Sequence, residues 1–140
     1  MKFGKIEQVQ FFPNAKPEEI YDAVADPKIQ SKYTGSKTTF DPVVGGKFTA
    51  WDDYIDGKNL ELVRGKKIFQ EWRTTEFPKS YPYSMLEFTF RAKDDGTELK
   101  MVHSKVPFSQ VKKYDEGWVS AYWDPLRKYL ENRNNVKKRK

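Results

Sequence analysis

The chain of 140 residues has the length of one domain, contains no cysteine and is 16% aromatic. This length is enough for a sizeable core, and the lack of cysteine excludes disulfides, thiol nucleophiles and thiolate metal sites. The net charge of +6 comes mostly from five cations beyond residue 131, because residues 1–131 hold 21 basic and 20 acidic side chains. We therefore expect a single, nearly neutral domain over residues 1–131, with no nucleic-acid partner, and a basic, disordered tail over residues 132–140.

The sequence also lacks the patterns of membrane and secreted proteins. No apolar run reaches the roughly 18 residues of a membrane-spanning helix. The first residues, Met-Lys-Phe-Gly-Lys-Ile-Glu, lack the apolar segment of a secretory signal. We expect a soluble, cytoplasmic protein with no membrane partner.

A strand and two short helices are predicted for the first part of the chain. Residues 5–12 favour a strand, which Pro13 ends. Pro17 suits a first helical turn and acidic residues follow it, so a helix is expected over residues 17–24. Asp26-Pro27 breaks that helix, and a second short helix is expected over residues 28–33.

The middle of the chain predicts an antiparallel meander, because short strand patterns alternate with turn signals. The turn signals are Gly45-Gly46, Asp56-Gly57, Arg64-Gly65, a proline-rich loop over 77–82 and Asp95-Gly96. The strands between them are expected over 37–41, 47–55, 58–63, 66–73, 83–93 and 97–106. Apolar and polar residues alternate from residue 86 to 93, so one face of this sheet should be dry.

Residues 115–130 predict a long helix with one aromatic side. Trp118, Tyr122, Leu126 and Leu130 recur every four positions and form an apolar stripe. Asp115 is expected to cap the N-terminus of the helix, and Pro125 is expected to bend it. Because the stripe needs a partner, we expect the helix to lie on the dry face of the sheet.

The order of these elements, one strand, two helices, six strands and one long helix, is that of a helix-grip fold. The predicted fold class is therefore α+β, with a curved antiparallel sheet of six or seven strands wrapped around the C-terminal helix. Folds of this kind often leave a cavity between the sheet and the helix.

Five blocks of the sequence, in this order, resemble one protein family. They cover residues 18–27, 41–48, 60–68, 71–73 and 116–126, and include Asp41-Pro42-Val43-Val44-Gly45-Gly46 and Glu71-Trp72-Arg73. They look like the homologues of the activator of the ninety-kilodalton heat-shock chaperone's ATPase, within the START-like superfamily that also resembles the birch-pollen allergen. The resemblance implies the helix-grip fold, with chaperone, stress-response or ligand-binding roles. The eukaryotic co-chaperones of this family carry an additional N-terminal domain, which has no counterpart in these 140 residues.

Our first functional hypothesis is a non-enzymatic binding domain that holds a small apolar or aromatic ligand between the sheet and the C-terminal helix. Ligand pockets are mostly apolar with a few polar anchors, and plain core packing is the alternative interpretation of the same side chains. The expected ligand-binding residues are Trp72, Phe88, Met101, His103, Trp118, Tyr122 and Leu126.

Two further hypotheses remain open. The resemblance implies a co-chaperone that binds the heat-shock chaperone and stimulates its ATPase. A cyclase- or hydrolase-like enzyme could use the cavity with His103 as general base. We predict no catalytic residue, no cofactor and no metal site, because a single histidine without cysteine makes a poor metal-ligand set and the acidic pairs Asp52-Asp53 and Asp94-Asp95 are not arranged to share a proton. Trp51 falls out of register with Phe48 and Ala50, so it is expected to be an exposed aromatic, either a contact residue or, more simply, a surface aromatic paired across strands.

Overall fold

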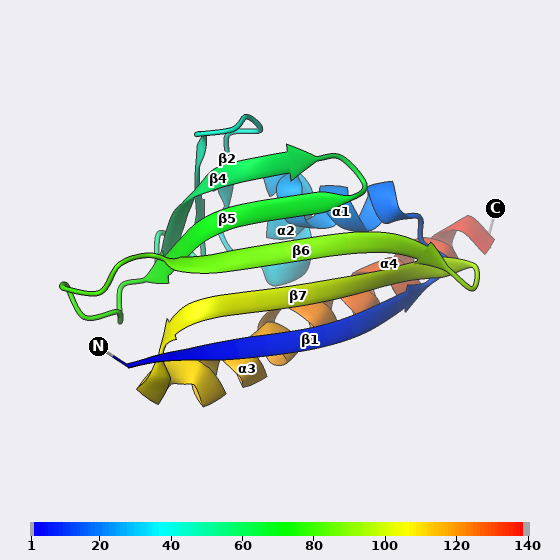
Figure 1. Ribbon diagram of the computed structural model, residues 1–140. Coiled ribbons are helices and arrows are strands. Elements are labelled where there is room, and N and C mark those ends of the chain that lie inside the picture. Colours follow the sequence, from blue (N-terminus) through cyan, green and yellow to red (C-terminus); the bar gives the residue numbers. More distant parts are fainter. Residues whose placement is uncertain (1, 139–140) are drawn as a thin grey trace.

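The computed structural model describes the backbone of residues 2–138 and the side chains of residues 2–133. One seven-stranded antiparallel sheet, in the order β1-β7-β6-β5-β4-β3-β2, curves around the C-terminal helix (Figure 1). The strands are β1 Phe3–Pro13, β2 Thr39–Phe40, β3 Lys47–Ala50, β4 Ile55–Val63, β5 Lys67–Thr74, β6 Ser84–Lys93 and β7 Gly96–Pro107. The predicted helix-grip architecture is confirmed, and each strand from β2 onward pairs with its neighbour in sequence.

The two predicted short helices are present between β1 and β2. They are α1 Pro17–Ala25 and α2 Pro27–Thr34. Asp26 separates them, and its carboxylate caps α2 by accepting a hydrogen bond from the Lys28 amide at 2.9 Å. Gly35 ends α2 with a φ of 73°, a conformation that glycine adopts without the steric cost of a Cβ.

The predicted turn at Asp56-Gly57 is wrong, because both residues lie inside β4. Gly57 serves a different purpose there. A Cβ on Gly57 would lie 1.9 Å from the Glu71 carbonyl oxygen and 2.6 Å from the Phe48 ring, so the glycine lets β4 approach its neighbours closely. The actual turn between β3 and β4 lies at residues 51–54, where three consecutive residues, Trp51, Asp52 and Asp53, have positive φ.

The C-terminal helix begins earlier than predicted. A 3-10 turn, η1 (Phe108–Gln110), leads into α3 (Val111–Gly117), so Asp115 lies inside the helix and its predicted role as N-cap is wrong. The Asp115 carboxylate instead accepts a hydrogen bond from the side-chain amide of Gln8 on β1 at 2.8 Å. This contact ties the helix to the first strand.

The expected irregularity at Pro125 takes the form of a π-helical segment, η2 (Trp118–Trp123), which precedes α4 (Asp124–Lys138). Proline lacks an amide proton, and its ring collides with the carbonyl four residues earlier in an ordinary α-helix. The wider π-turn relieves that collision, and the Asp124 amide bonds to the Val119 carbonyl five residues back.

The main core lies between the concave face of the sheet and the helix. Phe12, Phe88, Leu99, Trp123 and Leu126 are fully buried there. None of the helices within residues 2–138 is long and apolar enough to cross a membrane. The predicted domain boundary at residue 131 and the disordered tail stay predictions: α4 runs to Lys138, while residues 139–140 and the side chains from 134 onward lie outside the described part.

Candidate functional site

An aromatic cluster fills the space where η2 meets the concave face of the sheet. The π-helical turn brings Trp118 and Trp123 to the same side of the helix, where they are stacked with ring centroids 5.7 Å apart. Trp118 also packs edge-on against Phe88 of β6 at 5.6 Å and next to Trp72 of β5 at 5.9 Å. These rings occupy most of the space in which a ligand cavity was expected.

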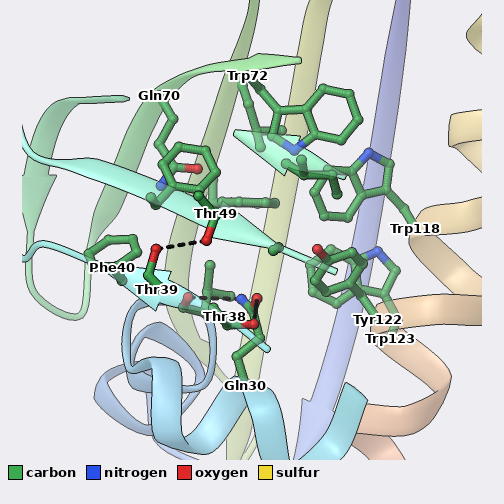
Figure 2. Close-up of a pocket in the computed structure, with 16 residues that line it drawn as sticks. Gln30, Thr38, Thr39, Phe40, Thr49, Gln70, Trp72, Trp118, Tyr122 and Trp123 are labelled. Carbon is green, nitrogen blue, oxygen red and sulfur yellow. Dashed lines mark hydrogen bonds between the residues drawn. The ribbon is translucent and has the colours of Figure 1, made fainter. Parts of the chain in front are cut away.

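A small cavity of about 30 Å³ remains beside this cluster (Figure 2). Its walls combine aromatic rings with polar side chains, among them Gln30, Thr49 and Gln70. The Gln70 amide donates to the Asn59 side-chain oxygen at 2.9 Å, so these polar groups already have protein partners. A space of this size holds about one water molecule, so it cannot take an apolar ligand.

A larger pocket of about 460 Å³ opens on the other side of the same aromatic wall. It lies between α3, the start of η2 and the turn from β3 to β4. Almost its whole lining is aromatic or aliphatic, with Lys113 as the single charged member. The lining residues are Trp51, Tyr54, Ile55, Trp72, Lys113, Tyr114, Gly117, Trp118, Ala121 and Tyr122.

Three rings separate the pocket from the small cavity. Trp72, Trp118 and Tyr122 line both spaces, together with Ile55. Figure 2 shows these rings beside the cavity, with Trp118 and Tyr122 coming from the helix and Trp72 from the sheet.

Small helix residues make room for the pocket. Gly117 and Ala121 are one helical turn apart on the pocket side, and a Cβ at Gly117 would meet no atom within 4 Å. Trp51 forms the opposite wall and packs edge-on against Tyr122 at 6.0 Å. Its half-buried position in a tight turn shows that the predicted surface pairing across strands is wrong.

A carboxylate holds the rim of the pocket together. Glu76 accepts hydrogen bonds from the Tyr54 hydroxyl on one wall and from the Lys113 ammonium on the other. Both bonds lower the pKa of Glu76, and the bond from Lys113 has the larger effect. Tyr114 adds a polar contact beneath, since its hydroxyl lies 2.6 Å from that of Thr74, and burial raises the pKa of this tyrosine.

His103 lies in the core rather than in the pocket. It is fully buried, with Nε2 2.8 Å from the Ser84 hydroxyl and Nδ1 accepting from the Trp118 indole at 3.3 Å. Burial lowers the pKa of His103 to about 3. A histidine in this environment is neutral and has both ring nitrogens occupied.

The seven predicted ligand-binding residues separate into three groups. Trp72, Trp118 and Tyr122 line the pocket. Phe88 lines only the small cavity. The remaining three are fully buried and line neither space: Met101, His103 and Leu126.

The sequence interpretation missed most of the outer wall of the pocket. Tyr114 had a usable signal, because it continues the spacing of four residues that joins Trp118 and Tyr122. Trp51 and Tyr54 had none, since the Asp56-Gly57 pattern placed the turn in the wrong position. Within residues 2–138, no three histidine, cysteine, aspartate or glutamate side chains gather closely enough to hold a metal ion.

Comparison with known proteins shows one family. A family model described as Activator of Hsp90 ATPase homolog 1-like protein matches residues 14–131. Activator of 90 kDa heat shock protein ATPase homolog 1 from Homo sapiens is 27% identical over 111 residues, which make up 79% of this chain and 32% of that protein. The chain thus spans about a third of the length of the curated relatives it matches.

Solved structures share the fold at low sequence identity. The crystal structure of an HSP90 activator from Plasmodium falciparum matches with a TM-score of 0.79 and 22% identity, covering 92% of this chain and 96% of that one. The crystal structure of DynU16, from the dynemicin biosynthetic locus, matches with a TM-score of 0.75 and 19% identity, covering 91% of this chain and 47% of that one.

Proposed function

The chain belongs to the family of Activator of Hsp90 ATPase homolog 1-like proteins, and from this premise we propose that it is a non-enzymatic binding domain whose aromatic pocket takes a small, flat, apolar ligand. The pocket of about 460 Å³ between α3, η2 and the turn from β3 to β4 is the observation that carries the proposal. Pockets for small molecules usually range from about 300 to 1,000 Å³ and have mostly apolar walls.

The shape of the pocket favours a flat ligand. The ring of Trp51 lines the pocket on the sheet side and the ring of Trp118 lines it on the helix side. Gly117 has no side chain and that of Ala121 is small, so the helix surface leaves room for a ligand. Aromatic surfaces bind flat apolar molecules by offset stacking and edge-on contact, and they gain from removing that area from water.

The surroundings of the pocket support binding over catalysis. His103, the only imidazole, is enclosed in the core with both nitrogens hydrogen-bonded, and it does not line the pocket. A general base must come within hydrogen-bond reach of the proton that it takes. The ionised group nearest the pocket is Lys113, which is paired with Glu76.

The four tryptophans give a direct test with an internal control. Trp51, Trp72 and Trp118 line the pocket, whereas Trp123 does not. Titration with small bicyclic and tricyclic aromatic hydrocarbons should shift the indole N–H signals of the first three in a nitrogen-15 NMR spectrum and leave that of Trp123 least affected. Equal shifts of all four signals, or no shift with any probe, would contradict the proposal.

Gly117 allows the pocket to be filled without disturbing the fold. It has ordinary helical backbone angles and open space at its Cβ. Gly117→Leu should abolish the indole shifts because its side chain occupies the pocket. Gly117→Ala is the matched control, which improves helix propensity by about 1 kcal/mol and should keep binding.

The family relationship favours a second function, which is stimulation of the ATPase of the 90-kDa heat-shock chaperone. The curated relatives are named for that activity, and the match to them covers 79% of this chain. Whether the domain suffices for the activity is tested by the ATP turnover of the chaperone with and without this protein. Stimulation together with co-purification would support the role, and the absence of both would exclude it.

The two functions can be separated with the same variant. Gly117→Leu changes the pocket and leaves most of the surface untouched. If the variant stimulates the chaperone like the wild-type protein but no longer binds the aromatic hydrocarbons, the contact with the chaperone does not use the pocket. If it loses both, the pocket is part of the chaperone contact.

A further inference from the structure

β1 forms a long, regular edge of the sheet. The opposite edge is a strand of two residues, β2, whereas β1 has eleven. The described residues place β7 on one side of β1 and no strand on the other (Figure 1). Long edge strands present unpaired amides and carbonyls that can pair with another chain.

The odd-numbered residues of β1 direct their backbone groups toward this edge. The Asn14 amide donates to the Asp95 carbonyl at 2.9 Å, so the even residues of β1 bond to β7. In an antiparallel pair the bonding alternates, and Lys5, Glu7 and Val9 therefore point their N–H and C=O groups away from β7. In agreement, the Phe11 carbonyl accepts from Arg127 of the helix rather than from β7.

β1 is also regular in its backbone. The irregularity in its pairing with β7 lies between Gly4 and Ile6, where β7 contributes one extra residue. Lys105 of β7 takes the positive φ of 57° that this bulge requires, and none of the β1 residues has positive φ. β1 therefore has no bulge that would bend its free edge and prevent pairing with another strand.

The outward side chains along this edge complement themselves. Lys5 and Glu7 are both 57% exposed, and Val9 is 60% exposed. A two-fold axis through Ile6 would place Lys5 opposite the Glu7 of a second copy and Phe3 opposite its Val9. The four charged groups would then alternate in sign around a square, flanked by one apolar pair at each end.

Other two-fold registers lose this match. An axis through Glu7 places the two Glu7 carboxylates opposite each other, and an axis through Lys5 does the same with two ammonium groups. An axis through Gln8 places Glu7 opposite Val9, so neither charge faces an opposite charge of the second copy and each keeps only its partner within its own chain. Like charges directly opposite destabilise strand pairs, so one register is favoured.

We propose that two copies of this chain pair through antiparallel β1 edges about a two-fold axis at Ile6, joining their sheets. The same patch on both copies makes the interface, as two-fold symmetry requires. Lys5 and Glu7 set the register, because they hydrogen-bond through their backbones and pair through their charges. The contact leaves the aromatic pocket untouched, since none of the pocket residues lies on β1.

The experiment measures the molar mass of the 140-residue chain by sedimentation equilibrium over a range of concentrations up to millimolar. The wild type should show a concentration-dependent dimer. Lys5→Glu and Glu7→Lys should each raise the dissociation constant roughly tenfold or more, because both symmetric charge pairs become repulsive. Lys79→Glu makes the same charge change on an exposed loop and should have no effect.

The double variant K5E/E7K decides the register. It exchanges the two charges, so each again faces its opposite in the second copy, and the dimer should return to about the wild-type dissociation constant. Near-ultraviolet circular dichroism should be the same for all four variants. A wild type that stays monomeric, single variants that dimerise like the wild type, or a double variant that stays monomeric would each overturn the proposal.

Discussion

His103 is held in one tautomer by a directional chain of hydrogen bonds. The Trp118 indole can only donate, so Nδ1 of His103 accepts and the proton lies on Nε2. Nε2–H then donates to the Ser84 hydroxyl, which donates in turn to the Trp72 carbonyl at 2.7 Å. This chain links two pocket residues, Trp72 and Trp118, through the core. The histidine therefore positions the pocket wall while remaining outside the pocket.

The buried histidine should make stability depend on pH in a defined direction. The pKa of His103 is about 3 in the folded protein and 6.5 for an exposed imidazole. Between these values the unfolded chain binds a proton that the folded chain does not. The free energy of unfolding is therefore not reduced by His103 above pH 6.5, and it decreases as the pH falls below that value. The loss is about 1.4 kcal/mol per pH unit.

Urea unfolding of the wild type and of His103→Gln between about pH 6 and pH 4 measures this contribution. The variant should be less stable at neutral pH, because it disturbs the hydrogen-bond chain, but it should lack the histidine part of the slope. Equal slopes in the two proteins would show that His103 is not the titrating group.

At the scale of single elements, local patterns predicted the faces of strands and helices better than their ends. The four-residue spacing that joins Trp118, Tyr122 and Leu126 placed the stripe on the correct side, because burial depends on periodicity. The start of the helix was missed, since Asp115 satisfies a cap pattern yet bonds to Gln8, which lies 107 positions away in the sequence. The turn predicted at Asp56-Gly57 was wrong for a similar reason, because the atoms that require a glycine at position 57 belong to β3 and β5.

The pocket depended on features that local patterns do not contain. The π-turn of η2 arises from the collision at Pro125 together with the packing of the rings on the sheet, and only the first of these is visible in the sequence. The turn at Trp51, Asp52 and Asp53 takes a conformation that L-residues avoid, so propensity alone predicts a strand there. The wall of the pocket formed by Trp51 and Tyr54 therefore could not be predicted from periodicity.

The bulge of β7 offers a prediction at this scale. Lys105 has a φ of 57°, where a side chain costs about 1 kcal/mol and glycine costs little. Lys105→Gly should therefore raise the free energy of unfolding by roughly 0.5 to 1 kcal/mol. Lys100→Gly removes the same charge from a regular position of the same strand and should lower it by a similar amount. Urea midpoints at unchanged m-values measure both effects, and a destabilised Lys105→Gly would contradict the strain argument.

On the scale of the whole molecule, the first strand and the last helix hold the fold closed. Gln8 of β1 accepts from the Trp123 indole at 2.9 Å and donates to Asp115, while Gln10 accepts from Arg127 at 2.7 Å. These contacts join residues more than 100 positions apart in sequence, so both ends of the chain must be in place before the core is complete. The aromatic pocket depends on the same closure, because its two walls come from the sheet and the helix.

Truncation tests this dependence and the predicted domain boundary together. A chain ending at Glu131 loses the partly exposed pair between Arg133 and Glu19, which is worth about 1 kcal/mol at most, and should keep a cooperative thermal transition. A chain ending at Gly117 loses five buried apolar side chains, each worth about 1.5 to 3 kcal/mol. The five lost side chains are Trp118, Tyr122, Trp123, Leu126 and Leu130.

That sum is comparable with the whole stability of a typical domain, about 5 to 15 kcal/mol, so the shorter chain should show no cooperative transition and no near-ultraviolet circular dichroism. Its exposed sheet face should also aggregate, because the apolar residues of β5 and β6 would then face water. A folded chain ending at Gly117 would show that the sheet is stable without the helix. An unfolded chain ending at Glu131 would move the domain boundary into the segment beyond that residue.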